Sequence, residues 1–163
     1  MRPIALTSAV VLLDQLAKLL VRRTFLLGDA VTVIPTVFDL RYVQNTGAAW
    51  GMMSGMMIVL IAFSVAMLAA IVVFRKKIFG DHPLSPWCLG LLCGGIIGNL
   101  IDRVRLGYVV DFLDFHWGIH HFPTFNVADS AICIGAGLFI LLSWLNDKSA
   151  KANGSKPSAA RAE

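Results

Sequence analysis

The sequence predicts an all-α membrane protein, with four transmembrane helices and a small extracytoplasmic β-sheet built from the two outer loops. Residues of the set AVILMFWYC make up 57% of the 163 residues, and charged residues only 15%. Soluble domains have roughly 45–50% apolar residues, glycine included, and about 25% charged residues. A soluble domain of this size could not bury so much apolar surface, because small domains leave much of their surface exposed.

Four apolar runs are about long enough to cross ~30 Å of hydrocarbon at ~1.5 Å per residue. They cover residues 3–21, 56–74, 86–101 and 128–145. The first run contains Asp14 and Lys18 and is not followed by a small-residue cleavage site. We therefore expect it to be a retained span and not a cleaved signal peptide.

Basic residues predict the orientation, because cytoplasmic loops of membrane proteins carry an excess of lysine and arginine. Most lie at the chain start, after the second run and after the fourth run: Arg2, Arg75, Lys76, Lys77, Lys148, Lys151, Lys156 and Arg161. They outnumber the basic residues of the first outer loop, which are Arg22, Arg23 and Arg41. Both termini should therefore be cytoplasmic. No basic stripe is interleaved with aromatic residues, so nucleic-acid binding is not expected.

The two outer connections, about residues 22–55 and 104–125, contain patterns typical of strands. Apolar and polar residues alternate between Ala30 and Gln44 with a break at Pro35, and residues 109–117 precede a turn at Gly118. We expect a sheet resting on the bilayer, with aromatic and histidine side chains at headgroup depth: Trp117, His120, His121 and Phe122. We expect one membrane domain over residues 1–147. Residues 148–163 have little to pack and are expected to form a disordered cytoplasmic tail.

Polar residues in a membrane protein are costly, and each needs a reason. Asp14 and Lys18 lie four residues apart on one face of the first run, where a charge pair can fix helix packing. In the third run Gly90, Gly94 and Gly98 recur every four residues, a pattern that lets a neighbouring helix pack closely.

Asn99 and Arg103 share a helix face near the end of the third run. Asn99 can form an interhelical hydrogen bond, and Arg103 can be an interfacial anchor whose guanidinium extends to the headgroups. Both residues can equally belong to a functional site. The segment 45–51 is rich in glycine and can be a simple turn before the second run.

Asp111 and Asp129 are the candidate catalytic residues. Asp111 lies in the apolar segment that leads toward the fourth run, and Asp129 lies where that run begins. Asp129 can also belong to a helix cap with Asn126. Two carboxylates in one site can divide so that one is protonated and one ionised, which suits aspartyl hydrolysis. We expect Asp111 to hold the proton and Asp129 to act as the base, because a helix start favours negative charge.

Other chemistry has weaker support in the sequence. His116, His120 and His121 could supply a base or a metal site, but no acidic or cysteine partner stands at metal spacing. The cysteines at 88, 93 and 133 lie in apolar runs and are expected to be structural. An alternative function is a small proton-coupled membrane transporter, with Asp14, Lys18, Asp102 and the two aspartates as a relay.

Five motifs together resemble the lipoprotein signal peptidases (signal peptidase II), a family of bacterial membrane aspartyl peptidases. The motifs are Asp14-Gln-Leu-Ala-Lys18, Asn45-Thr-Gly47-Ala-Ala, Gly95 with Gly98-Asn99-Leu-Ile-Asp102-Arg103, Val109-Val-Asp111-Phe, and Phe125-Asn126-Val-Ala-Asp129-Ser130. Any one of them is weak, but all five occur in the family's order. They cover most of the chain, from Asp14 to about Gly137.

The resemblance implies an aspartic endopeptidase of the bacterial inner membrane, with its active site near the outer surface. It implies cleavage of diacylglyceryl-modified prolipoproteins just before the lipidated cysteine, without a metal or organic cofactor. Asp111 and Asp129 correspond to the catalytic aspartates, while Asp14, Lys18 and Asp102 are the polar structural residues. Substrate would be bound by Asn45, Gly47, Asn99, Arg103 and Asn126. Membrane lipids and the cyclic peptide inhibitors of the family are the other expected partners.

Overall fold

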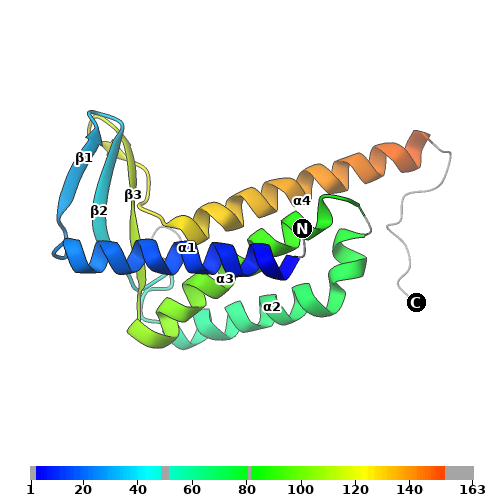
Figure 1. Ribbon diagram of the computed structural model, residues 1–163, viewed down its shortest axis with the longest axis horizontal. Helices are drawn as coiled ribbons and strands as arrows, with labels where there is room; N and C mark the ends of the chain where they lie inside the picture. Colours follow the sequence, from blue (N-terminus) through cyan, green and yellow to red (C-terminus); the bar gives the residue numbers. More distant parts are fainter. Residues whose placement is uncertain (1–2, 49–51, 81, 153–163) are drawn as a thin grey trace.

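Four long helices form the body of the protein (Figure 1). The structure is a computed structural model, and it describes residues 3–48, 52–80 and 82–152. The helices are α1 (Pro3–Thr24), α2 (Met57–Phe79), α3 (Ser85–Leu106) and α4 (Val127–Ala152). Each is long and apolar enough to cross a membrane. The four predicted spans are therefore confirmed. Every helix also runs beyond its apolar stretch, because backbone hydrogen bonding continues past the edge of the hydrocarbon.

α3 is the central helix and contacts each of the other three. α1 and α3 end near the sheet, and α2 and α4 return toward the opposite end of the bundle (Figure 1). The last turns of α1, α2 and α3 all carry basic residues, which interact favourably with the negative end of the helix dipole.

The sheet stands across one end of the bundle (Figure 1). It contains β1 (Ala30–Ile34), β2 (Phe38–Asn45), β3 (Val109–Trp117) and β4 (His120–His121), antiparallel and in that order. The first outer connection thus supplies β1 and β2, and the second supplies β3 and β4. This confirms the sheet predicted from the alternating pattern. A register shift between Leu40 and Val43 interrupts the pairing of β2 with β3.

The predicted start of the tail, at residue 148, differs from the structure. α4 continues through Ala152, so residues 148–152 are helical and not an irregular extension. Alanine and lysine are good helix formers, and here they prolong a helix that is already nucleated. The rest of the expected tail, residues 153–163, lies outside the described residues, as do residues 49–51 of the glycine-rich segment.

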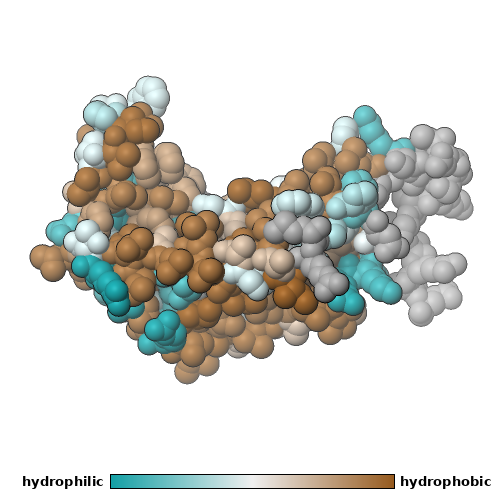
Figure 2. All heavy atoms as spheres, viewed as in Figure 1, coloured by the Kyte–Doolittle hydropathy of each residue, from teal (hydrophilic) through white to brown (hydrophobic). Residues whose placement is uncertain are grey.

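The outer surface of the bundle is apolar. Large side chains such as Ile58, Phe63 and Val73 on α2 are more than half exposed. Figure 2 shows this apolar surface along the helices, with hydrophilic side chains gathered mainly toward the two ends. An exposed apolar surface of this extent is stable when lipid covers it.

The repeated glycines of α3 lie against α1. A Cβ atom added at Gly90 would lie 2.8 Å from Leu6, one at Gly94 would lie 2.7 Å from Val10, and one at Gly98 would lie 2.7 Å from Asp14. The close-packing face predicted from the spacing is confirmed. Gly95 faces α4 instead, and a Cβ atom added there would lie against the backbone carbonyl oxygen of Ala128 in the first turn of α4. Glycine therefore brings both α1 and α4 against α3.

Replacing Gly95 by alanine should destabilise the protein. The new methyl group would collide with the carbonyl oxygen of Ala128, and backbone cannot move aside as a flexible side chain can. Overpacking of this kind costs about 1–3 kcal/mol, so the unfolding temperature in detergent should fall by roughly 5 °C. The matched control is Gly137→Ala in α4, where the added group would meet no described atom within 4 Å beyond its chain neighbours and its own helix backbone. An equal loss in both variants would contradict the packing argument.

Candidate active site

Asp111 lies on β3 and is buried, with a side chain only 2% exposed. Two asparagine side chains donate to it. The Nδ2 of Asn126 lies 2.7 Å from its Oδ1, and the Nδ2 of Asn45 lies 3.0 Å from its Oδ2. The first donor comes from the residue preceding α4 and the second from the end of β2. The carboxyl of Asp111 is therefore fixed by two separate elements.

Asp129 is in the first turn of α4, and its environment is different. Its backbone N–H donates to Oδ1 of Asn126 at 2.9 Å, and its own Oδ2 accepts from the backbone N–H of Asn126 at 3.2 Å. This reciprocal pair is a capping arrangement, so the cap considered from the sequence is present. The Oδ1 of Asp129 accepts from Nδ2 of Asn99 at 2.7 Å. The helix start favours a negative charge at this position.

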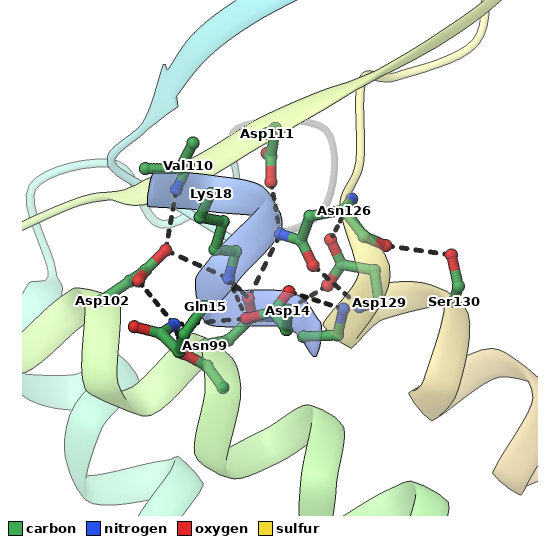
Figure 3. Close-up of polar contacts among 12 residues, drawn as sticks. Asp14, Gln15, Lys18, Asn99, Asp102, Val110, Asp111, Asn126, Asp129 and Ser130 are labelled. Carbon is green, nitrogen blue, oxygen red and sulfur yellow. Dashed lines mark hydrogen bonds and ion pairs between the residues drawn. The ribbon is translucent and has the colours of Figure 1, made fainter. Parts of the chain in front are cut away.

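Asn99 and Asn126 connect the two carboxyl groups (Figure 3). The Nδ2 of Asn126 lies 3.2 Å from Oδ1 of Asn99, in addition to its bond to Asp111. Both asparagines are buried. The result is a continuous chain of hydrogen bonds from Asp111 through the two amides to Asp129. Each carboxyl group keeps contact with N–H donors and shares one cavity with the other.

That cavity has a volume of about 730 Å³ and lies at the sheet end of the bundle. β2, β3, α3, α4 and the segment before α4 all contribute to its walls. Its polar lining comprises Gln44, Asn45, Thr46, Ser54, Asn99, Arg103, Asp111, Thr124, Asp129 and Ser130. Its apolar lining includes Val43, Val109, Phe122, Phe125 and Ile132. Such a cavity can hold an extended peptide together with apolar side chains.

Asn126 and Gly47 stand apart from the other predicted substrate-binding residues, because neither lines the cavity. Asn126 is fully buried and donates to Asp111. Gly47 has a different contact. Its backbone N–H donates instead to Oδ1 of Asn45 at 2.9 Å. That contact leaves Nδ2 of Asn45 directed at Asp111. The structure therefore gives Gly47 a role in orienting Asn45, through a local turn that residue spacing alone does not reveal.

Arg103 lines the same cavity near the end of α3. Its Nε is buried and has no hydrogen-bond partner among the residues that the structure describes. Asp129, Asp111 and Asp102 are the acidic groups that act electrostatically on its guanidinium. A buried cationic donor beside an open cavity can bind a carbonyl oxygen of a ligand.

Lys18, Asp14 and Asp102 form an ion cluster beneath the cavity. The Nζ of Lys18 lies 2.8 Å from Asp14 and 3.0 Å from Asp102, and all three side chains are buried. Asp102 also accepts from the backbone N–H of Val110, the second residue of β3, which directly precedes Asp111. The charge pair considered for the first span is therefore present, and it reaches α3 as well.

Asp14 also contacts the start of α4. Its Oδ1 accepts from the backbone N–H of Ala128 at 2.9 Å. Gln15, which the sequence interpretation passed over, donates to Asp102 at 3.0 Å and to the carbonyl of Gly98 at 3.2 Å. A glutamine inside an apolar span was the available signal, because polar groups there need partners.

The environment of Asp111 changes its acidity. Burial, and then the negative charge of Asp129, raise the pKa of Asp111 to about 7, although the hydrogen bonds from Asn45 and Asn126 oppose the shift. A carboxyl with this pKa is largely protonated below neutral pH. The expectation that Asp111 holds the proton has this physical support.

The histidines lie outside the cavity. His116 is 3.4 Å from Asp39, and His121 is 2.9 Å from Asp114, both on the sheet. Their rings stack with centroids 4.8 Å apart. These contacts belong to the sheet, and within the described ranges no three metal-ligating side chains form a cluster.

Comparisons with known proteins agree with this geometry. The sequence model of the family Peptidase_A8, signal peptidase (SPase) II, matches residues 6–145. The lipoprotein signal peptidase of Syntrophotalea carbinolica is 45% identical over 142 residues, which cover 85% of this chain and 88% of that protein. The one from Haemophilus influenzae is 37% identical over 147 residues, which cover 88% and 85%.

A solved structure has a similar fold. It is described as a bacterial membrane enzyme at 2.3 Å resolution and superimposes with a TM-score of 0.82 at 35% identity, covering 98% of this chain and 94% of that one. Two carboxyl groups that line one cavity, four helices able to span a membrane and these matches agree. This chain belongs to the signal peptidase II family of aspartic peptidases.

Proposed function

We propose that this protein removes the signal peptide from diacylglyceryl-modified prolipoproteins, cutting just before the lipidated cysteine. The observation that carries the proposal is the pair of carboxyl groups, Asp111 and Asp129, which line one cavity and are linked through Asn99 and Asn126. The substrate class follows from the lipoprotein signal peptidases that this chain resembles over most of its length.

The two carboxyl groups divide the chemistry. Asp129, at a helix start with two N–H donors, takes a proton from a water molecule as that water attacks the scissile carbonyl. Asp111, which keeps its proton up to about pH 7, gives it to the leaving amine. The water supplies the hydroxyl of the new carboxyl end. In total, one proton has passed through the pair formed by Asp111 and Asp129, which we call the dyad.

Substrate binding falls to polar groups around the dyad. Arg103 has a buried, unpartnered Nε beside the cavity and is the group that we assign to a backbone carbonyl of the substrate. Asn45, Asn99 and Asn126 position the carboxyl groups. Asn45 and Asn99 also line the cavity and would border the peptide, and Gly47 supports Asn45. Binding energy from groups remote from the scissile bond can then orient that bond for attack.

The location of the cavity suits a lipid-modified substrate. It lies at the sheet end of the bundle and has apolar walls, so an apolar signal helix and acyl chains can remain in the bilayer while the scissile bond meets water. Membrane lipids contact the apolar outer surface of the helices. The cyclic peptide inhibitors of the family are expected to occupy the same cavity.

We place the protein in the bacterial inner membrane, with both termini in the cytoplasm and the cavity near the outer surface. At the end opposite the sheet, the described residues contribute four basic side chains: Arg75, Lys76, Lys77 and Lys148. Those at the sheet end are Arg22, Arg23, Arg41, Arg103 and Arg105. Arg103 lines the cavity, and in the sequence Arg2, Lys151, Lys156 and Arg161 add to the count for the side of the termini.

The transporter alternative requires polar groups along a path through the bundle. The ion cluster and the dyad instead converge at the sheet end, where the same hydrogen-bond network joins them. That arrangement favours a site for chemistry.

Replacing either aspartate by asparagine should abolish cleavage. An amide keeps the shape of the carboxyl group but can neither take a proton from water nor give one to an amine at neutral pH. Asp111→Asn and Asp129→Asn should lower the rate by at least about a thousandfold and still bind uncleaved substrate. The assay measures release of the signal peptide from a purified lipid-modified prolipoprotein in detergent. Substantial turnover by either variant would rule out the dyad mechanism.

The pH profile should reveal the proton on Asp111. A group whose pKa is raised to about 7 loses its proton as pH rises through that value, so the general acid disappears. The value of kcat/KM should therefore fall above pH 7, and on the acid side it should fall as the base becomes protonated. The measurement is initial cleavage rate across the pH range in which the protein stays folded. A flat profile would refute the proton assignment.

Arg103→Ala should reduce cleavage much more than it reduces stability. Removing a group that binds a substrate carbonyl costs roughly tenfold to a hundredfold in kcat/KM, whereas a guanidinium without a hydrogen-bond partner at Nε contributes little to holding the helices together. Cleavage kinetics and thermal unfolding should be measured on the same preparation. A parallel collapse of both would support the interfacial-anchor interpretation.

Topology can be tested with reporters fused to the chain. A reporter enzyme that works only in the cytoplasm should be active when it is fused after Lys148 and inactive when it is inserted in the turn at Gly118. A reporter that works only outside the cytoplasm should be inactive after Lys148 and active at Gly118. The opposite pattern would reverse the proposed orientation and place the cavity on the cytoplasmic side.

A further inference from the structure

The ammonium group of Lys18 has a complete set of partners. Lys18 is only 2% exposed, and its Nζ lies 2.8 Å from Asp14 Oδ2, 3.0 Å from Asp102 Oδ2 and 2.9 Å from Asn99 Oδ1. An ammonium has three N–H donors and cannot accept a hydrogen bond. Each donor has one acceptor here. The third acceptor is an amide that also contacts the dyad.

This contact helps to orient the amide of Asn99, whose Oδ1 also accepts from Nδ2 of Asn126 at 3.2 Å. With Oδ1 facing Lys18, Nδ2 faces Oδ1 of Asp129 at 2.7 Å. A reversed amide would place its NH2 group against the ammonium and its oxygen against the carboxylate, and both contacts would be repulsive. Asn126 is oriented separately, because its Oδ1 accepts from the backbone N–H of Asp129.

We propose that Lys18 is a positioning residue for the peptidase reaction. It acts through Asn99 to keep an N–H donor on Asp129, and so holds Asp129 as the ionised member of the dyad. The inference rests on the proposed function of the dyad. It gives Lys18 a role in the reaction that a charge pair between helices does not require.

The directional hydrogen bond carries this effect more than net charge does. Lys18 is flanked by Asp14 and Asp102, so the cluster has a formal charge of −1 and its overall field does not favour a further anion. The other charged groups around Asp129 are Arg103 on α3 and Asp111 on β3. Of these contacts, only the path through Asn99 links Lys18 to Asp129 by hydrogen bonds.

The test compares pH profiles of cleavage for Lys18→Met and Asp102→Asn. Both variants disturb the same buried cluster, but only the first removes the charged donor to Oδ1 of Asn99 and leaves the amide of Asn126 as its remaining donor. In Lys18→Met the acidic midpoint of kcat/KM should move to higher pH by about one unit, and kcat should fall by about tenfold or more with a smaller change in KM. In Asp102→Asn the midpoint should not move upward, although thermal stability should fall.

A second variant keeps the test decisive if Lys18→Met does not fold. Asn99→Asp retains an oxygen for Lys18 but places another oxygen against Asp129, so the acidic midpoint should again move upward. Rates should be normalised to folded protein. An unchanged midpoint in the folded variants, or an equal upward move in Asp102→Asn, would overturn the inference. A parent enzyme that does not cleave lipid-modified prolipoprotein at all would instead overturn the proposed function.

Discussion

The interior of a bilayer offers no water, so every polar group buried between these helices must find its partner in the protein. The structure meets that requirement by sharing partners between elements. Asp14 on α1 accepts from Lys18 and from the first turn of α4, and Asp102 on α3 accepts from Lys18 and from the start of β3. The same bonds that satisfy the buried groups therefore help to fix where α4 and β3 begin, and these elements carry the two carboxyl groups that we propose as catalytic.

Close helix packing makes this sharing possible. Gly98 leaves room for the Asp14 carboxylate against α3, and Gly95 lets the first turn of α4 approach α3. A larger side chain at either position would separate the helices and lengthen bonds that are now near 3 Å. Buried charges are tolerated only with good geometry, because an uncompensated charge is strongly destabilising. The buried charge pairs therefore depend on the glycines, because only close helix packing keeps the paired groups within hydrogen-bond distance.

Sequence patterns predicted the parts of this protein that depend on one element at a time. The four spans follow from length and hydropathy, the strands from alternation, and the candidacy of Asp111 and Asp129 from carboxyl groups in apolar surroundings. Contacts between distant segments could not be obtained in this way. Nothing in the spacing shows that Asp14 meets Ala128, or that Gly47 orients Asn45. The end of α4 was missed for another reason, since hydropathy marks where the hydrocarbon ends but not where helical hydrogen bonding ends.

The division of roles that we propose for the two carboxyl groups follows from the kinds of elements that hold them. A helix start presents unpaired N–H groups, and Asp129 lies among them with an additional amide donor from Asn99. A strand within a sheet has most of its N–H groups paired along the ladder. Among the described residues, Asp111 therefore receives its donors from two side chains, while burial and the neighbouring charge oppose its ionisation. A bundle of helices alone would supply two similar carboxyl groups. The sheet at the end of this bundle supplies one that is different, and an acid and a base that must act in the same step require that difference.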